Sequence, residues 1–202
     1  MMPGLQHGPL DAAAVHLCID MQRLFAPGSP WQVPWLVKIL SRVERFAEAV
    51  AAQTIFTRFI PPPNKHDVPG TWRRFYERWD ELTLHRIDPD LLELVEPLQA
   101  FCPPAPVLDR WRYSCFTNRR LGALLRERRS SAIVVTGGES DVCVLATVMD
   151  AVDLGYRVVI ATDGVCSSAD STHDAIMSLY HARFSQQIET ASLEEIRDAW
   201  RS

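Results

Sequence analysis

The sequence predicts an α/β domain in which helices cover both faces of a parallel sheet. Short apolar runs of strand length alternate along the chain with longer segments of helical period, which is the pattern of such a domain. Each of these runs is followed by a helix or a connection that contains one. The 202 residues, 47% of them apolar, suffice for one hydrophobic core but not for two large domains. We therefore expect residues 1–202 to form a single domain.

Six apolar runs have strand length, and helical segments separate them. The strands are predicted at 14–19, 53–59, 106–109, 132–136, 157–161 and 187–190. The helices are predicted at 35–52, 89–101, 118–129, 141–154, 170–183 and 192–201. Because right-handed crossovers join successive strands of this kind, the strands should lie in parallel.

Residues 61–85 interrupt the alternation. Prolines and a glycine at positions 61, 62, 63, 69 and 70 forbid a long helix, whereas the aromatic residues at 72, 75, 76 and 79 are too apolar for a solvated linker. We expect a loop with a short helix. Its role remains open: it closes one side of the core, or it serves as a lid over a pocket or as a contact between subunits.

Charge, hydropathy and cysteine usage narrow the classes of function. The net charge is -4 and basic residues are interleaved with acidic ones, so nucleic acid is not an expected partner. No apolar run approaches the roughly 18 to 20 residues of a membrane-spanning helix, and the first residues lack the pattern of a secretory signal. We expect a cytoplasmic protein that makes no membrane contact. The five scattered cysteines are interpreted as free thiols.

Three candidate site residues follow predicted strands. Ligands of open parallel sheets bind at the carboxyl ends of the strands. Asp20 follows the first strand, Arg110 the third and Cys143 the fourth. Each also has a simpler interpretation: Asp20 as a turn cap, Arg110 as a solvated or paired surface cation, and Cys143 as a small core residue.

The position of Cys143 favours a nucleophile. Ser140 is expected to cap a helix, which places Cys143 in its first turn. The unpaired N–H groups and the helix dipole there lower the pKa of a thiol, and the thiolate attacks carbonyl carbon. The same N–H groups can hold an oxyanion.

Three stretches resemble the signatures of the isochorismatase-like cysteine hydrolases: LCIDMQ, RWRYSCF and TGGESDVCVLATVMDAVDLGYRVVIATDGVCSS. They occur in the order and approximate spacing of that superfamily, across residues 15–200. The resemblance implies a Rossmann-like sheet of strand order 3-2-1-4-5-6 and an Asp, Lys, Cys triad, with the aspartate at Asp20 and the nucleophile at Cys143. It also implies a cis peptide bond between Gly138 and Glu139, and an oxyanion hole made by the backbone N–H groups of Glu139 and Cys143.

Position 110 departs from the family pattern. The family has lysine there, this chain has Arg110, and neither Lys38 nor Lys65 lies at a matching strand end. Arginine keeps the positive charge, but its planar fork is bulkier and donates hydrogen bonds in other directions. We expect Arg110 to work in an adjusted site; the alternative is reduced or altered activity.

No metal and no cofactor are expected. Nicotinamidase-type relatives place an Asp-x-His pair after the second strand, whereas this chain reads FTRFIPPPNKHD, and its six histidines show no ligand spacing. His173 and Asp174, which follow two serines, suggest a serine hydrolase, but such residues at a helix start are explained more simply as caps.

The resemblance implies hydrolysis of a small-molecule C–N bond, in an amide or ureide, through a thioester on Cys143. In this interpretation Asp20 moves the proton and Arg110 stabilises charge. One alternative is a vinyl-ether hydrolase of the isochorismatase kind, which uses no thiol. The other is a binding or scaffold protein that has lost catalysis through the change at position 110.

Four aromatic residues lie near the predicted strand ends and are expected to bind substrate, with core packing as the alternative for each. They are Phe25, Trp72, Tyr113 and Phe116. The sequence does not identify the small-molecule substrate. We further expect a homo-oligomer, either a dimer or a tetramer.

Overall fold

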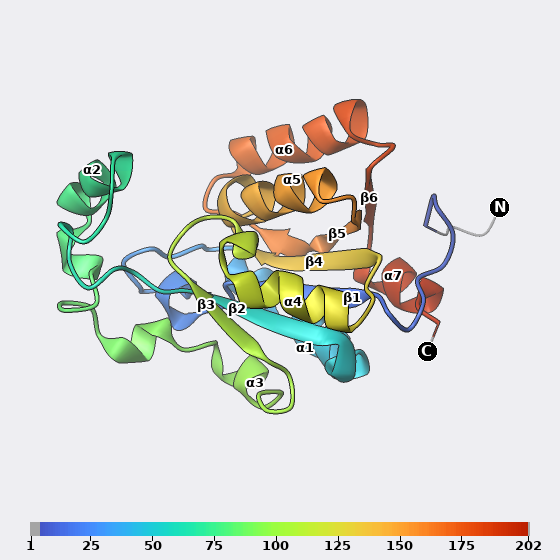
Figure 1. Ribbon diagram of the computed structural model, residues 1–202, viewed down its shortest axis with the longest axis horizontal. Coiled ribbons are helices and arrows are strands. Elements are labelled where there is room, and N and C mark those ends of the chain that lie inside the picture. The colour runs from blue at the N-terminus through green and yellow to red at the C-terminus, as the bar shows by residue number, and fades with distance from the viewer. Residues whose placement is uncertain (1–4, 202) are drawn as a thin grey trace.

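The computed structural model describes residues 5–201, which form a six-stranded parallel sheet flanked by helices (Figure 1). The strands are β1 (Val15–Ile19), β2 (Thr54–Phe59), β3 (Val107–Arg110), β4 (Ala132–Gly138), β5 (Arg157–Cys166) and β6 (Ile188–Ala191). Their order is β3-β2-β1-β4-β5-β6, and every neighbouring pair is parallel. The predicted fold class and strand order are therefore confirmed.

The helices lie close to their predicted positions, with one exception. They are α1 (Leu36–Ala49), α2 (Thr71–Arg78), α3 (Glu96–Gln99), α4 (Arg119–Glu127), α5 (Leu145–Asp153), α6 (Asp170–Arg183) and α7 (Leu193–Ala199). The single helix predicted at 89–101 is wrong: a 3₁₀ turn at Pro89–Leu92 and the short α3 take its place. Pro97 explains the break, because its ring would clash with the carbonyl of Glu93 in a continuous helix.

Two helical layers sandwich the sheet. Helices α4, α5 and α6 pack on one face, against Val15, Leu17 and Ile19 of β1 and the matching residues of its neighbours. Helices α1, α3 and α7 pack on the other face, where Cys18 of β1 points. Burial on both faces explains why the strand-like runs of the sequence are apolar almost throughout.

Close approach of β1 and β4 brings two strand ends together. Gly137 has a φ of +99°, and a Cβ there would lie 2.0 Å from the carbonyl oxygen of Ile19, so only glycine fits. Asp20, directly after β1, has a φ of +53° in the left-handed region. Residues other than glycine that adopt a positive φ cost conformational energy, and they concentrate at functional sites.

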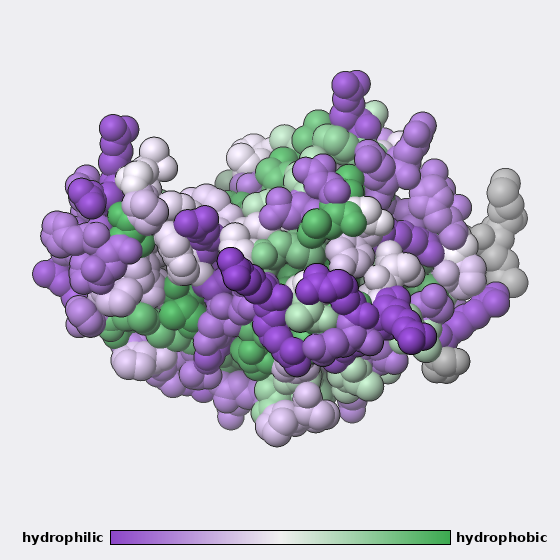
Figure 2. Space-filling view, in the orientation of Figure 1, coloured by the Kyte–Doolittle hydropathy of each residue, from purple (hydrophilic) through white to green (hydrophobic). Residues whose placement is uncertain are grey.

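Residues 61–85 form an arm that contains α2, the short helix expected there. We call this segment the α2 arm. It lies at one end of the molecule, away from α4, α5 and α6 (Figure 1). In the space-filling view a hollow separates the arm from the main body, and the outer surface of the arm is largely hydrophilic (Figure 2). None of the helices in residues 5–201 is long and apolar enough to cross a membrane.

Candidate active site

The three residues predicted from the strand ends meet in the structure. The Asp20, Arg110 and Cys143 side chains are all buried. A guanidinium N–H of Arg110 donates to Oδ2 of Asp20, and the hydroxyl of Thr57 donates to Oδ1 at 3.0 Å. The thiol of Cys143 lies beside the same carboxylate, whose negative charge contributes to raising the pKa of the thiol. The carboxylate therefore has a cation and a thiol as direct neighbours.

Burial governs the protonation of this cluster. It raises the pKa of Asp20, an effect that the Arg110 charge opposes. Burial, together with the negative charge of Asp20, raises the pKa of Cys143 well above its ordinary value. The expectation that the helix start lowers this pKa is thus wrong, because desolvation of the sulfur outweighs the helix terminus. Burial therefore favours the protonated thiol of Cys143, which lies beside the Asp20 carboxyl group.

Cys143 lies in a π-helical turn, Ser140–Val144, that leads into α5. Ser140 does not cap this helix as expected; its hydroxyl hydrogen-bonds with Nδ1 of His173 at 2.9 Å, since Ser140 is already inside the turn. The peptide bond between Gly138 and Glu139 is cis, as the family resemblance implies.

Three consecutive residues, 139–141, hydrogen-bond with residues 167–173, the segment that leads into α6 and forms its first turn. The bonds are Ser168 N–H to Glu139 Oε1 at 3.0 Å, Ser140 with His173, and the Ser167 hydroxyl to Asp141 Oδ1 at 2.7 Å. These bonds also account for His173 and the two serines that suggested a serine hydrolase. They hold the turn that carries Cys143 rather than forming a second reactive group.

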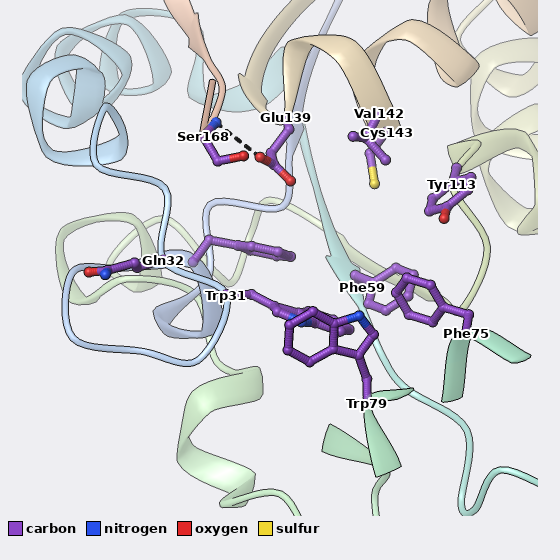
Figure 3. A pocket seen from close by; sticks show the side chains of 11 residues that line it. Trp31, Gln32, Phe59, Phe75, Trp79, Tyr113, Glu139, Val142, Cys143 and Ser168 are labelled. Atoms are coloured by element: carbon purple, nitrogen blue, oxygen red, sulfur yellow. Dashed lines mark hydrogen bonds between the residues drawn. The ribbon is translucent and has the colours of Figure 1, made fainter. Parts of the chain in front are cut away.

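A pocket of about 290 Å³ opens beside Cys143. Its lining residues are Phe25, Trp31, Gln32, Phe59, Phe75, Trp79, Tyr113, Glu139, Val142, Cys143 and Ser168. Glu139, Val142 and Cys143 lie on one side of the cavity, and Trp31, Phe59 and Trp79 lie across from them (Figure 3). The sulfur of Cys143 points into the space between the two sides.

The four aromatic residues predicted to bind substrate divide into two pairs. Phe25 and Tyr113 line the pocket. Trp72 lies outside it and packs against Tyr113, with ring centroids 4.7 Å apart. Phe116 also lies outside, stacked on Tyr156 at 6.0 Å beside the core under α4 and α5.

Several lining residues were not predicted. Phe59 ends β2 and could have been found by the same strand-end rule. Phe75 and Trp79 belong to the α2 arm, whose unusual aromatic content was the only signal. Trp31 follows a proline and glycine-rich stretch, and nothing in its local sequence indicates a pocket. The carboxylate of Glu139 was also missed, because only its backbone N–H was considered.

The described residues, 5–201, contain no group of three or more histidine, cysteine, aspartate or glutamate side chains arranged to hold a metal ion. The polar side chains around Cys143 instead form hydrogen bonds with one another or with the backbone.

The chain matches a known family of proteins. The model of the isochorismatase domain matches residues 14–192. The chain belongs to the isochorismatase family. With this assignment it is an isochorismatase-family hydrolase, and its sheet order fits that family.

Three relatives illustrate the match. An uncharacterized isochorismatase family protein, PncA, of Bacillus subtilis is 30% identical over 86 residues, which cover 43% of this chain and 47% of that protein, about half its length. Nicotinamidase 3 of Arabidopsis thaliana is 25% identical over 84% of this chain and 81% of its own. The crystal structure of a cysteine hydrolase from Pseudomonas syringae pv. phaseolicola 1448A superposes with a TM-score of 0.80 at 25% identity, covering 98% of both chains.

Proposed function

We propose that this protein hydrolyses a C–N bond of a small amide or ureide, with Cys143 as the nucleophile. The observation that carries the proposal is the position of the Cys143 thiol, which lines a pocket and lies beside the buried Asp20–Arg110 pair. Relatives named nicotinamidase and cysteine hydrolase support an amide as substrate and a cysteine as nucleophile.

The first half of the reaction forms a thioester. Asp20 takes the thiol proton as the sulfur of Cys143 attacks the carbonyl carbon and a C–S bond forms. The backbone N–H groups of Glu139 and Cys143 serve as donors to the developing oxyanion. When the tetrahedral intermediate collapses, the C–N bond breaks. Asp20 gives its proton to the leaving nitrogen, which departs as ammonia or an amine.

The second half releases the acid. Asp20 takes a proton from water, and the oxygen of that water attacks the thioester carbonyl. The C–S bond then breaks and the sulfur of Cys143 recovers a proton, so the enzyme returns to its resting state. The raised pKa of Asp20 suits this role, since a stronger base accepts a proton more readily from thiol and water.

Arg110 supplies the positive charge of the site. Its guanidinium donates to Asp20, and its positive charge opposes the rise in the pKa of Asp20 that burial causes, which favours the ionised carboxylate. An ammonium group in the family pattern would supply the same charge from a single nitrogen.

The test is to capture the thioester. Purified protein is incubated with a panel of small primary amides, ammonia release is followed, and intact-protein mass spectrometry is used to detect an acylated chain. We expect acylation on Cys143, release of the acyl group as a hydroxamate on addition of hydroxylamine, and complete loss of both signals in Cys143→Ala.

Cys102→Ala is the matched control, because Cys102 is a partly buried thiol that does not line the pocket. It should keep full activity. Amide hydrolysis that survives in Cys143→Ala would overturn the covalent mechanism. Hydrolysis of a vinyl ether by that variant would favour the isochorismatase alternative instead.

A further inference from the structure

The pocket lining combines aromatic rings with a single charge, and that charge is negative. Six of the eleven lining residues are aromatic, and Glu139 is the only ionisable side chain among them besides Cys143 and Tyr113. None of the eleven is lysine, arginine or histidine. The buried Asp20 and Arg110 beneath the pocket compensate one another's charge. The charged side chain that lines this cavity is therefore an anion.

Trp31 is at the centre of the aromatic side. Its ring centroid lies 6.3 Å from Phe25, 5.9 Å from Phe59, 5.8 Å from Phe75 and 5.7 Å from Trp79. The faces of such rings carry negative partial charge and attract cations, most strongly in the case of tryptophan. Two rings of this cluster already have a cation beside them: the guanidinium of Arg110 lies over Phe59 at 5.4 Å, and that of Arg78 lies over Trp79 at 5.3 Å.

The Glu139 carboxylate lies on the opposite side of the cavity, next to the nucleophile (Figure 3). Its Oε1 accepts the N–H of Ser168 at 3.0 Å. Its Oε2 accepts no hydrogen bond from any residue in 5–201, so one full acceptor remains open at the pocket. Ligand binding costs free energy when it removes water from a carboxylate and supplies no new hydrogen-bond or ionic partner.

We propose that the pocket selects an amide whose non-reacting end carries a weakly hydrated positive charge, such as an alkylated ammonium or pyridinium group. The aromatic rings and Glu139 would surround this group while the carbonyl lies at Cys143. This proposal rests on the proposed function for the reaction, and adds the charge of the substrate. A carboxylate-bearing amide would be repelled by Glu139, and a neutral one would desolvate Glu139 without compensation.

A pair of isosteric amides provides the test. Betaine amide, 2-(trimethylammonio)acetamide, differs from 3,3-dimethylbutanamide only in that a positively charged nitrogen replaces the quaternary carbon. Succinamate is a third amide, which carries a negative charge. Binding is measured by isothermal titration calorimetry to Cys143→Ala, which cannot form the thioester. We expect betaine amide to bind at least about tenfold more tightly than its neutral isostere, with succinamate weakest. Equal affinity of the isosteres would overturn the proposal.

Two variants in the Cys143→Ala background locate the preference. Glu139→Gln keeps the backbone N–H and Trp31→Leu keeps an apolar side chain, so each should lower the preference for the cation several-fold with little effect on the neutral amide. Glu127→Gln makes the same charge change at an exposed carboxylate on α4 and should leave the preference unchanged. A preference that persists in both pocket variants would overturn the assignment of the cation to this cavity.

The two proposals fail separately. Hydrolysis of neutral and cationic amides with equal affinity would leave the proposed function intact and remove the charge selectivity. A strong preference for the cation in Cys143→Ala, without acylation of the unmodified protein by any amide, would support the ligand charge and overturn the hydrolytic function.

Discussion

The two sides of the pocket are built in different ways. The reactive side, formed by Asp20, Arg110 and Cys143, is carried by the carboxyl ends of strands, and each of its side chains is at most 7% exposed. The aromatic side, formed by Phe25, Trp31, Phe75 and Trp79, is carried by the connection after β1 and by the α2 arm, and its residues are only partly buried.

Because of this difference, substitutions on the two sides of the pocket should have different consequences. On the reactive side the charges of Asp20 and Arg110 are buried and compensate one another, so loss of either affects folding as well as chemistry. On the aromatic side the rings contact each other and the cavity, so replacement of one ring should alter binding more than it alters the nucleophile. In the function proposed above, the reaction and the choice of substrate therefore depend on different parts of the fold.

The largest effect is expected for Asp20→Asn. The amide cannot accept the thiol proton, so amide turnover should fall by about a thousandfold or more. It also leaves the Arg110 guanidinium buried without an anion, which should lower the free energy of unfolding by about 3 to 5 kcal/mol. Turnover and urea denaturation of the same preparation check both parts.

Asp109→Asn is the matched control for that variant. Asp109 pairs with Arg58, but its side chain is 48% exposed, so we expect a loss of at most about 1 kcal/mol and normal turnover. If Asp20→Asn were no less stable than Asp109→Asn, the proposed coupling between charge and folding on the reactive side would be wrong.

A smaller, pH-dependent effect is expected at Arg110. The guanidinium lowers the pKa of Asp20, and without it the burial effect is unopposed. Arg110→Met should therefore move the acidic limb of the pH–rate profile to higher pH, because a smaller fraction of Asp20 is ionised at neutral pH. Arg110→Lys keeps the charge and should keep most of the profile.

Arg58→Met serves as the comparison, since Arg58 pairs with Asp109 and Glu93 outside the pocket. It should leave the acidic limb in place. An acidic limb that stays fixed in Arg110→Met would show that Arg110 does not set the ionisation of Asp20.

The sequence predicted the reactive side better than the aromatic side, for a physical reason. Asp20, Arg110 and Cys143 follow strands whose positions are fixed by apolar runs, and parallel strands end at a common edge. Trp31, Phe75 and Trp79 come from irregular segments whose paths depend on tertiary packing. Neither periodicity nor spacing relates residue 31 to residue 79, although their rings are 5.7 Å apart.

The same limit explains the error about the Cys143 pKa. A position at a helix start can be inferred from local sequence, but the extent of burial around a sulfur depends on residues distant along the chain. Ser140 was misassigned as a cap for a similar reason, since its partner His173 is 33 residues away. Local signals therefore located the proposed nucleophile but gave the wrong direction for the shift of its pKa.

The smallest effect concerns the sheet beneath the reactive side. His16 of β1 is buried between β2 and β4, with Nδ1 3.0 Å from the Thr54 hydroxyl and Nε2 2.8 Å from the Thr136 hydroxyl. Burial lowers its pKa from 6.5 to about 3. Between these values the unfolded chain binds a proton that the folded chain does not, so stability should fall as pH decreases below 6.5.

The contribution of His16 is up to about 1.4 kcal/mol per pH unit in this window. His16→Gln retains a donor and an acceptor but does not titrate, so its free energy of unfolding should fall less steeply from pH 6 to pH 4 than that of the unmodified protein. Urea denaturation at pH 7, 6, 5 and 4 measures the two slopes, and the comparison cancels the contribution of Asp20, whose raised pKa acts with the opposite sign in both proteins. Parallel slopes would mean that His16 takes up its proton in the folded protein, and that the sheet under the reactive side is less closed than its hydrogen bonds imply.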